Sequence, residues 1–141
     1  MIDLPTIADA VATHARLSPN QLATRDSQRS LSWAEWHERA TRLAAALRAL
    51  ELAKGDRVGV VAYNRIEWME IYAGLARAGL VAVPLNFRLT SPEIEYIVTH
   101  SESVAFIVQD ELIDRVQPLR NVLNISQNAY VSFGAYVPSD W

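Results

Sequence analysis

The region after Gly55 constrains the fold of this chain more than any other feature of its sequence. Short apolar runs alternate there with stretches whose apolar residues recur at helical spacing. The runs are Val58–Tyr63, Leu80–Val83 and Val104–Val108. Consecutive buried strands joined by helices are typical of parallel sheets that carry helices on their faces. The alternation therefore predicts an α/β fold with an open, mostly parallel sheet and flanking helices.

Turn and cap residues predict where these elements begin and end. Asn64 with Glu67 fits a capping box at the start of the first connecting helix, and Thr90 with Glu93 fits one at the start of the second. Pro84 is predicted to end the strand between these helices, because proline lacks the N–H group that a sheet ladder uses. The helices and strands of this region are therefore predicted to be short and closely spaced.

The chain beyond the third apolar run is predicted to add one more helix and strand. The helix is expected at about Asp110–Val116 and the strand at Asn121–Ile125. Residues 128–141, which read NAYVSFGAYVPSDW, are aromatic and apolar but follow neither the helical nor the strand period. No element is predicted there, and we expect the chain to be truncated on this side.

Two helices with a small hairpin between them are predicted before the parallel strands. The first helix begins after a cap at Thr6 and runs to about Leu17. The hairpin pairs Leu22–Arg25 with Arg29–Leu31 across the turn-forming residues Asp26–Gln28. The apolar face expected for the first helix is Ile7, Ala10, Val11 and Ala15.

The second helix has the clearest pattern in the sequence. Ser32 and Glu35 fit a capping box at its start, and Gly55 marks its predicted exit. Its apolar residues at helical spacing are Trp33, Trp36, Ala40, Leu43, Ala44, Leu47 and Leu50. This spacing favours core packing over a ligand pocket for the two tryptophans.

Composition excludes several classes of function. The net charge is -3 and the twelve arginines are scattered, so the sequence predicts no basic face for nucleic acid. The absence of cysteine excludes disulfides and cysteine metal sites, and it favours a cytoplasmic location. The longest apolar stretch, Ile71–Phe87, contains Arg77 and Pro84 and is too short for a membrane span. No transmembrane segment is predicted.

One loop carries candidate binding residues. Ligands of open parallel sheets bind at the carboxyl ends of the strands. After the second predicted strand stand Asn86 and Arg88, whose amide and guanidinium groups could orient a polar or anionic part of a substrate. The alternative is that Asn86 satisfies backbone groups in a turn while Arg88 pairs with a nearby acid. Both interpretations stay open from the sequence.

No catalytic or metal-binding residue can be assigned. The chain has five glycines, and they are too scattered to form a phosphate-cradling loop. The histidines His14, His37 and His100 lie on three separate predicted helices, without a second ligand at metal spacing.

Residues 55–98 carry an ordered series of motifs. The series consists of Gly55–Val58, Asn64 with Glu67, Ala78–Gly79, Pro84–Asn86 with Arg88, and Glu93. In this order it strongly resembles the amino-terminal region of acyl-CoA synthetases in the adenylate-forming superfamily. The asparagine at position 86 resembles the fatty- or aryl-acid CoA ligase branch of this superfamily. Peptide-synthetase adenylation domains usually carry Asp at this position. The resemblance extends from about Thr6 to Ile125, with Ser32-Trp33 where a Ser/Thr-Tyr pair is more usual.

The resemblance implies that residues 1–141 are part of the large N-terminal domain of an adenylate-forming enzyme. Such a parent converts a carboxylate, ATP and CoA to acyl-CoA, AMP and pyrophosphate through an acyl-adenylate, and it uses Mg²⁺. The family's loop ending in Pro-Lys-Gly has no counterpart here, so the chain alone is expected to be inactive and to bind none of these cofactors tightly.

The resemblance also bears on partners. It implies the remainder of the ligase or another ligase chain as the macromolecular partner, and a small carboxylic acid as the parent's substrate. Two alternatives remain. One is a non-catalytic interaction module that pairs with another ligase chain through the aromatic segment Tyr130–Trp141. The other is an independent α/β domain that binds a small ligand near Asn86 and Arg88.

Overall fold

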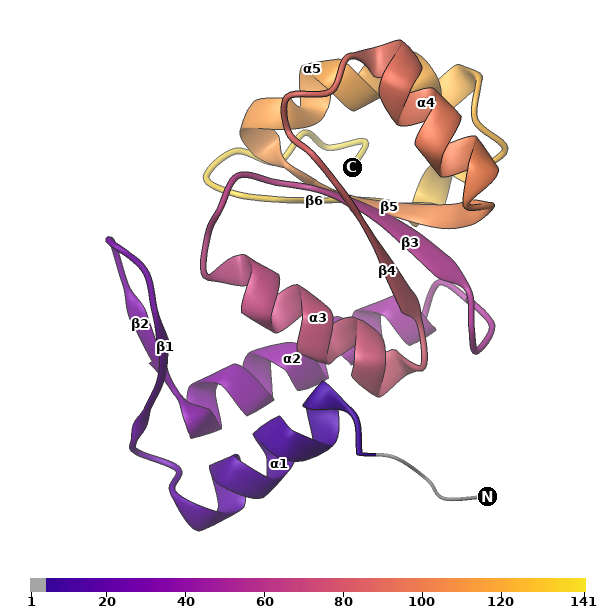
Figure 1. Ribbon diagram of the computed structural model, residues 1–141. Coiled ribbons are helices and arrows are strands. Elements are labelled where there is room, and N and C mark those ends of the chain that lie inside the picture. The colour runs from indigo at the N-terminus through magenta and orange to yellow at the C-terminus, as the bar shows by residue number, and fades with distance from the viewer. Residues whose placement is uncertain (1–4) are drawn as a thin grey trace. The chain divides into compact units, whose positions relative to one another are not determined.

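The computed structural model describes residues 5–141, which form two compact units (Figure 1). One unit contains the described residues up to Lys54 together with Asn64–Leu80, and the other contains Gly55–Tyr63 and Val81–Trp141. The chain therefore passes from the first unit to the second and back before it completes the second. No helix among residues 5–141 is long and apolar enough to cross a membrane.

The first unit is built from three helices and a hairpin. Its elements are α1 (Ile7–Leu17), β1 (Leu22–Arg25), β2 (Ser30–Ser32), α2 (Trp33–Arg48) and α3 (Glu67–Ala78). The predicted hairpin is confirmed: β1 and β2 are antiparallel. Asp26 shapes its turn, because one carboxylate oxygen accepts the backbone N–H groups of Gln28 at 2.8 Å and of Arg29 at 2.9 Å.

Helix α1 begins as predicted but buries a different face. Thr6 and Asp9 form a reciprocal capping box at its start. The buried residues are Ala8 and Val11, while Ile7 and Ala10 are exposed. The predicted apolar face was therefore wrong at these two positions. Val11 belongs to the core cluster of the unit, whereas Ile7 lies in the first turn of the helix and is 41% exposed.

Helix α2 supplies much of the core of the first unit. Its capping box at Ser32 and Glu35 is present as predicted. The helix ends at Arg48, earlier than the predicted exit at Gly55, and Glu51 then takes a left-handed conformation with φ of 57°. The core cluster around α2 contains Val11, Leu31, Trp36, Ala40, Ile66 and Ala73.

Helix α3 begins without the predicted capping box. Its N-cap is Ile66, which makes no side-chain cap, and Asn64 is exposed. The backbone N–H of Ile66 instead donates to Asp26 at 3.1 Å. A carboxylate 40 residues away in the sequence therefore satisfies a donor at the helix start that the local pattern assigned to Asn64.

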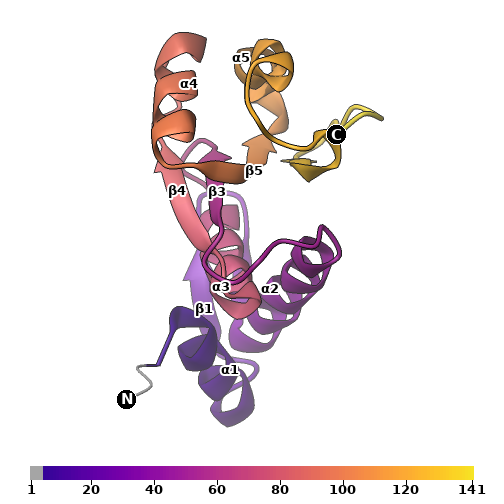
Figure 2. The same cartoon turned by 90° about the vertical axis from the view of Figure 1, so that its right-hand side faces the viewer.

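The second unit is built around a parallel sheet of four strands with the order β4-β3-β5-β6 (Figure 2). The strands are β3 (Arg57–Val61), β4 (Val81–Leu85), β5 (Ser103–Gln109) and β6 (Tyr130–Phe133). The helices are α4 (Ser91–His100) and α5 (Ile113–Val116), and three 3₁₀ segments occupy Asp110–Leu112, Gln117–Asn121 and Gln127–Ala129. The predicted α/β class and parallel sheet are confirmed.

Two strand predictions were wrong. Strand β4 does not end at Pro84 but continues to Leu85. It lies at the edge of the sheet, where a residue without an N–H can sit without breaking an inner ladder. The fourth strand is not Asn121–Ile125 but β6, within the segment where no element was predicted. Tyr130 of β6 stacks on Phe106 of β5, with ring centroids 6.2 Å apart.

Candidate functional site

The loop after β4 holds both candidate binding residues predicted from the sequence. The Asn86 side-chain oxygen accepts the backbone N–H of Arg88 at 2.9 Å, and its backbone oxygen accepts the N–H of Leu89 at 3.1 Å. This is an Asx-type turn, in which a side chain replaces a backbone acceptor. The structural role predicted for Asn86 is thus confirmed, and Asn86 and Arg88 are both exposed.

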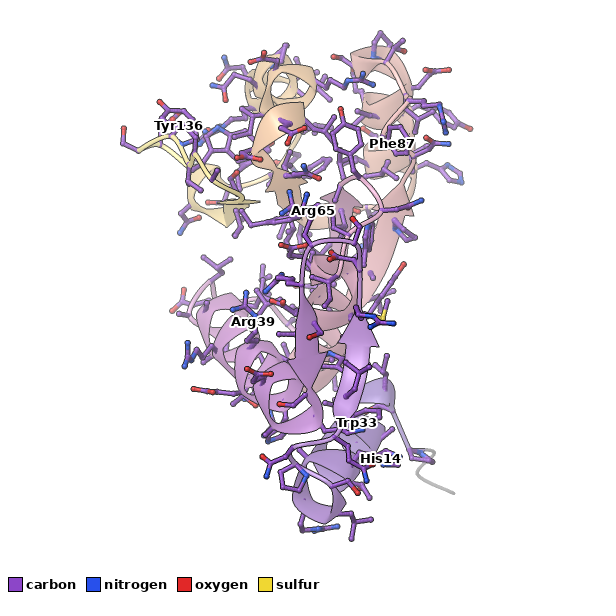
Figure 3. The ribbon with its side chains drawn as sticks, turned by 90° about the vertical axis from the view of Figure 1, so that its left-hand side faces the viewer. His14, Trp33, Arg39, Arg65, Phe87 and Tyr136 are labelled. Carbon is purple, nitrogen blue, oxygen red and sulfur yellow. The ribbon has the colours of Figure 1, made fainter. Side chains whose placement is uncertain are left out.

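Arg88 stacks on an aromatic ring and has no acidic partner within the described part of the chain. Its guanidinium carbon lies 4.6 Å from the centroid of the Phe87 ring. The predicted ion pair of Arg88 was therefore wrong, since a neighbouring ring face attracts the cation instead. Phe87 in turn meets the Tyr63 ring edge to face, with 5.0 Å between centroids (Figure 3).

Arg115 fixes the course of this loop from a distant point in the sequence. One terminal nitrogen of its guanidinium donates to the backbone oxygen of Phe87, and also to that of Leu89 at 3.1 Å. The hydroxyl of Ser91 donates to the backbone oxygen of Arg115 at 2.8 Å. Sequence reasoning did not single out Arg115, because nothing in its local pattern points to a loop 26–28 residues earlier.

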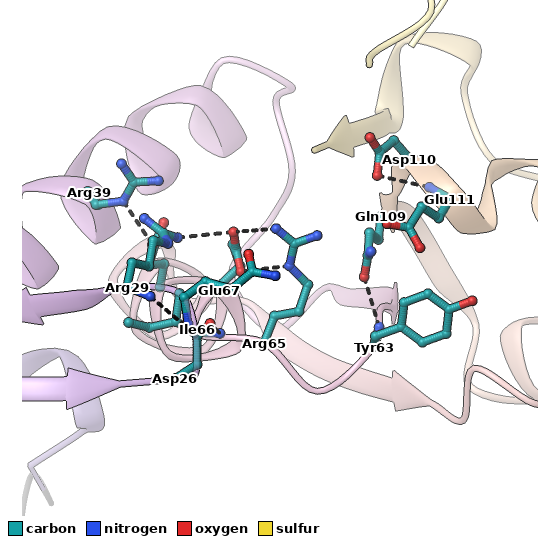
Figure 4. Close-up of polar contacts among 12 residues, drawn as sticks. Asp26, Arg29, Arg39, Tyr63, Arg65, Ile66, Glu67, Gln109, Asp110 and Glu111 are labelled. Atoms are coloured by element: carbon teal, nitrogen blue, oxygen red, sulfur yellow. Dashed lines mark hydrogen bonds and ion pairs between the residues drawn. The ribbon is translucent and has the colours of Figure 1, made fainter. Parts of the chain in front are cut away.

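Strand β5 ends at Gln109, and the side chains of Gln109 and of the following Asp110 bind backbone groups (Figure 4). Gln109 is buried, and its side-chain oxygen accepts the N–H of Tyr63 at 2.9 Å. Asp110 accepts the N–H of Glu111 at 2.9 Å and that of Tyr136 at 3.0 Å. These polar groups therefore organise the chain at the carboxyl ends of the strands.

A separate cluster of charges lies within the first unit (Figure 4). One oxygen of Glu70 accepts from both Arg29 and Arg39, each at 2.8 Å. Glu67 pairs with Arg29 at 3.0 Å and with Arg65 at 3.0 Å and 3.1 Å. Burial acts to raise the pKa of Glu67, but the hydrogen bonds and the arginine charges outweigh it and lower that pKa.

The aromatic residues at the start of α2 serve packing. Trp36 is buried, and its indole N–H donates to the backbone oxygen of Met69 at 2.8 Å. Trp33 stacks on Trp36 and on His14, with centroids 5.4 Å and 4.5 Å apart (Figure 3). This agrees with the core role predicted for both tryptophans, and it gives His14 a stacking partner.

Residues 5–141 contain no group of three or more His, Cys, Asp or Glu side chains that could hold a metal ion. The polar groups at the strand ends bind backbone atoms, and the charged cluster of the first unit pairs two glutamates with three arginines. These contacts hold loops and helices in position.

Comparison with known proteins identifies the family. Residues 11–137 match the family described as AMP-binding enzyme. The fatty acid–[acyl-carrier-protein] ligase ScoC of Streptomyces coeruleorubidus is 35% identical over 108 residues, which are 77% of this chain and 21% of that protein. The 3-oxocholest-4-en-26-oate–CoA ligase of Rhodococcus rhodochrous is 31% identical over 137 residues, which are 92% of this chain and 25% of that protein.

A solved structure gives the same result for the fold. The inhibitor-bound N-terminal domain of FACL13 from Mycobacterium tuberculosis superposes with a TM-score of 0.78 at 28% identity. The match covers 92% of this chain and 34% of that one. The chain thus spans about a fifth to a quarter of the length of the two curated relatives. With residues 11–137 matched by the family model, the chain belongs to the AMP-binding enzyme family.

Proposed function

We propose that this chain is an N-terminal piece of an AMP-forming acid–CoA ligase. The observation that carries the proposal is the family match over residues 11–137, combined with relatives of which the match covers only 21% and 25%. The relatives named above are ligases of organic acids, which supports a fatty or aryl carboxylic acid as the parent's substrate. We place the parent and this chain in the cytoplasm, consistent with the absence of cysteine.

The parent's reaction has two steps. A carboxylate oxygen attacks the α-phosphorus of ATP and displaces pyrophosphate, and the thiol of CoA then attacks the acyl carbon and releases AMP. Stabilisation of the charge that develops on phosphate and acyl oxygens dominates such chemistry. ATP, Mg²⁺ and CoA are therefore the cofactors we propose for the parent.

The residues of this chain do not fit those cofactors. Its five glycines form no clustered loop for a triphosphate, and residues 5–141 offer no metal-ligand group. We infer that the chain alone is inactive and holds none of the three tightly. Asn86 and Arg88 remain the candidates for contact with a polar or anionic part of the parent's substrate, since both are exposed at the end of β4.

The rest of a ligase polypeptide, or another ligase chain, is the partner we propose. A non-catalytic module that pairs with a ligase is the second candidate. Tyr136 and Val137 favour it, because these apolar side chains are 74% and 44% exposed in the C-terminal segment. Trp141 does not support it, because its ring packs against Tyr130 of the same unit.

Exchange of labelled pyrophosphate into ATP tests the proposal. The purified 141-residue chain should give no exchange above background with a panel of aliphatic and aryl carboxylic acids, while a full-length ligase in the same assay does. Exchange that depends on one of the acids would contradict the proposed inactivity and would place an adenylation site within these residues.

A further inference from the structure

Arg120 is a buried cation whose surroundings the family match does not explain. Its side chain is 7% exposed, although no sequence pattern marked it as a core residue. A buried guanidinium is costly unless its N–H groups and its charge find partners. The groups that contact Arg120 therefore indicate which class of ligand this part of the second unit can bind.

Within residues 5–141, two residues supply the hydrogen-bond acceptors of the Arg120 side chain. Gln127 accepts from Nε at 3.0 Å with its side chain and from one terminal nitrogen at 3.1 Å with its backbone. The other terminal nitrogen donates to the backbone oxygen of Asp140 at 2.9 Å and to its carboxylate at 3.0 Å. Gln127 therefore binds one side of the guanidinium, and Asp140 supplies the only negative charge among these acceptors.

Two aromatic rings complete the surroundings of the guanidinium. Its carbon lies 4.9 Å from the Tyr130 ring centroid and 5.0 Å from that of Trp141. The Trp141 indole N–H also donates to the side chain of Gln117 at 2.7 Å. Burial raises the pKa of the Tyr130 hydroxyl, although the charge of Arg120 acts to lower it. The phenol therefore stays neutral at physiological pH and offers the cation a ring face rather than a charge.

The C-terminal residues 136–141 contact the rest of the second unit mainly through the two ends of this segment. At one end Tyr136 donates its backbone N–H to Asp110 at 3.0 Å, and at the other Asp140 and Trp141 engage Arg120. Between them Val137 is exposed, and the Asp140 side chain is itself 60% exposed. The family match ends at residue 137, so Asp140 and Trp141 lie outside it.

We propose that Arg120, Gln127 and Tyr130 form a recognition site for a carboxylate followed by an aromatic ring in a polypeptide segment, and that Asp140 and Trp141 fill it in cis. A charge-assisted hydrogen bond to the carboxylate and two ring faces around one guanidinium define the ligand class. The site is independent of the ligase chemistry and requires none of its cofactors.

Peptide binding to a vacated site tests the proposal. In the full chain carrying Asp140→Ala and Trp141→Ala, the site is empty, and retained folding is checked by circular dichroism. The probe is a fluorescently labelled, capped Val-Pro-Ser-Asp-Trp peptide, followed by anisotropy. We expect the vacated chain to bind it at least about tenfold more tightly than the unsubstituted chain, whose own segment competes at an effective concentration on the order of millimolar.

Matched peptides and a matched variant distinguish specific recognition from nonspecific binding. Val-Pro-Ser-Asn-Trp and Val-Pro-Ser-Asp-Ala should each bind about tenfold more weakly, since each lacks one recognised group. Adding Arg120→Gln to the vacated chain should abolish binding, and if that variant does not fold, the three peptides decide alone. Equal binding to the vacated and unsubstituted chains, or equal binding of the three peptides, would overturn the proposal.

Discussion

Glu70 shows how one buried side chain organises the first unit. Its carboxylate is 10% exposed and accepts from two guanidinium groups, which come from the hairpin region and from α2. Removing the charge leaves Arg29 and Arg39, whose side chains are 33% and 42% exposed, facing a neutral group at a buried position. The free energy of unfolding that is lost with the charge depends on burial. At an exposed position water can solvate the remaining partner, and at a buried position it cannot.

A comparison of two glutamates tests this dependence on burial. Glu70→Gln should lower the free energy of unfolding by about 1 to 2 kcal/mol, since the arginines are partly solvated and the full cost of a buried pair does not apply. Glu38→Gln removes a pair with Arg42 in which both side chains are mostly exposed, and it should cost less than about 0.5 kcal/mol. Urea denaturation measures both, and equal costs would contradict the account.

The capping carboxylates predict how stability changes with acid. Hydrogen bonds from the cap residues lower the pKa of Asp9, Glu35 and Glu93 below their ordinary values of 3.8 for Asp and 4.5 for Glu. A carboxyl with a lower pKa in the folded state stabilises the fold above its unfolded pKa, and this contribution is lost as the pH falls. The unfolding midpoint should therefore hold from pH 7 to about pH 5 and drop below about pH 4.5.

Glu93→Gln isolates one of these groups. At pH 7 the substituted chain should be less stable, because a neutral amide accepts the Thr90 hydrogen bonds less strongly than a carboxylate does. The stabilising contribution of the carboxylate is lost as the pH falls below 4.5 and through the lowered pKa of Glu93, so the difference should be smaller at pH 3 than at pH 7. Chemical denaturation at the two pH values measures the difference, and a constant difference would contradict the assignment.

At the scale of elements, the contact between α2 and α3 depends on a missing side chain. A Cβ atom at Gly74 would lie 2.7 Å from one methyl carbon of Leu43 and 3.0 Å from the next carbon. Both distances are shorter than packed carbons tolerate, so the two helices can approach this closely only with glycine at this position.

The double substitution at this contact provides a test. Gly74→Ala should destabilise the chain by about 1 kcal/mol, because overpacking costs roughly 1 to 3 kcal/mol and helix propensity returns about 1 kcal/mol. In a Leu43→Ala background the space is open, and the same substitution should cost nothing or stabilise. Thermal or urea unfolding of the four chains measures the coupling. An identical effect of Gly74→Ala in both backgrounds would contradict the packing argument.

The sequence predicts most reliably those features that depend on residues only a few positions apart. The caps predicted at Thr6, Ser32 and Thr90 involve residues three apart, and all three formed. The box predicted at Asn64 did not form, because the distant Asp26 binds the start of α3 instead. Strand β6 depends on pairing with β5, more than 20 residues earlier, and residues 128–141 carry no period that reveals it. Pro84 was misread because an edge position is a property of the whole sheet.

The same division applies to the candidate site. The Asn86 turn spans three residues and was predictable, whereas the support from Arg115 spans 26–28 residues and was not. The residue types at the strand ends indicated where a candidate site would lie. They did not indicate which side chains would bind backbone atoms.

At the scale of the whole molecule, the chain has the fold of its family, and we propose that it lacks the groups that carry out the chemistry. It matches AMP-binding enzymes over residues 11–137, yet it spans about a fifth to a quarter of the two curated relatives compared here. The strand ends and charged clusters hold loops and helices in place. The central claim is therefore that these residues are a scaffold portion of a longer AMP-forming ligase.

Sequencing the coding DNA downstream of Trp141, read in all three frames, tests that claim most directly. The account predicts a glycine-rich loop ending in Pro-Lys-Gly within the following codons, together with the rest of an AMP-binding enzyme. A coding region that ends without such a loop in any frame would contradict it and would favour a stand-alone interaction module.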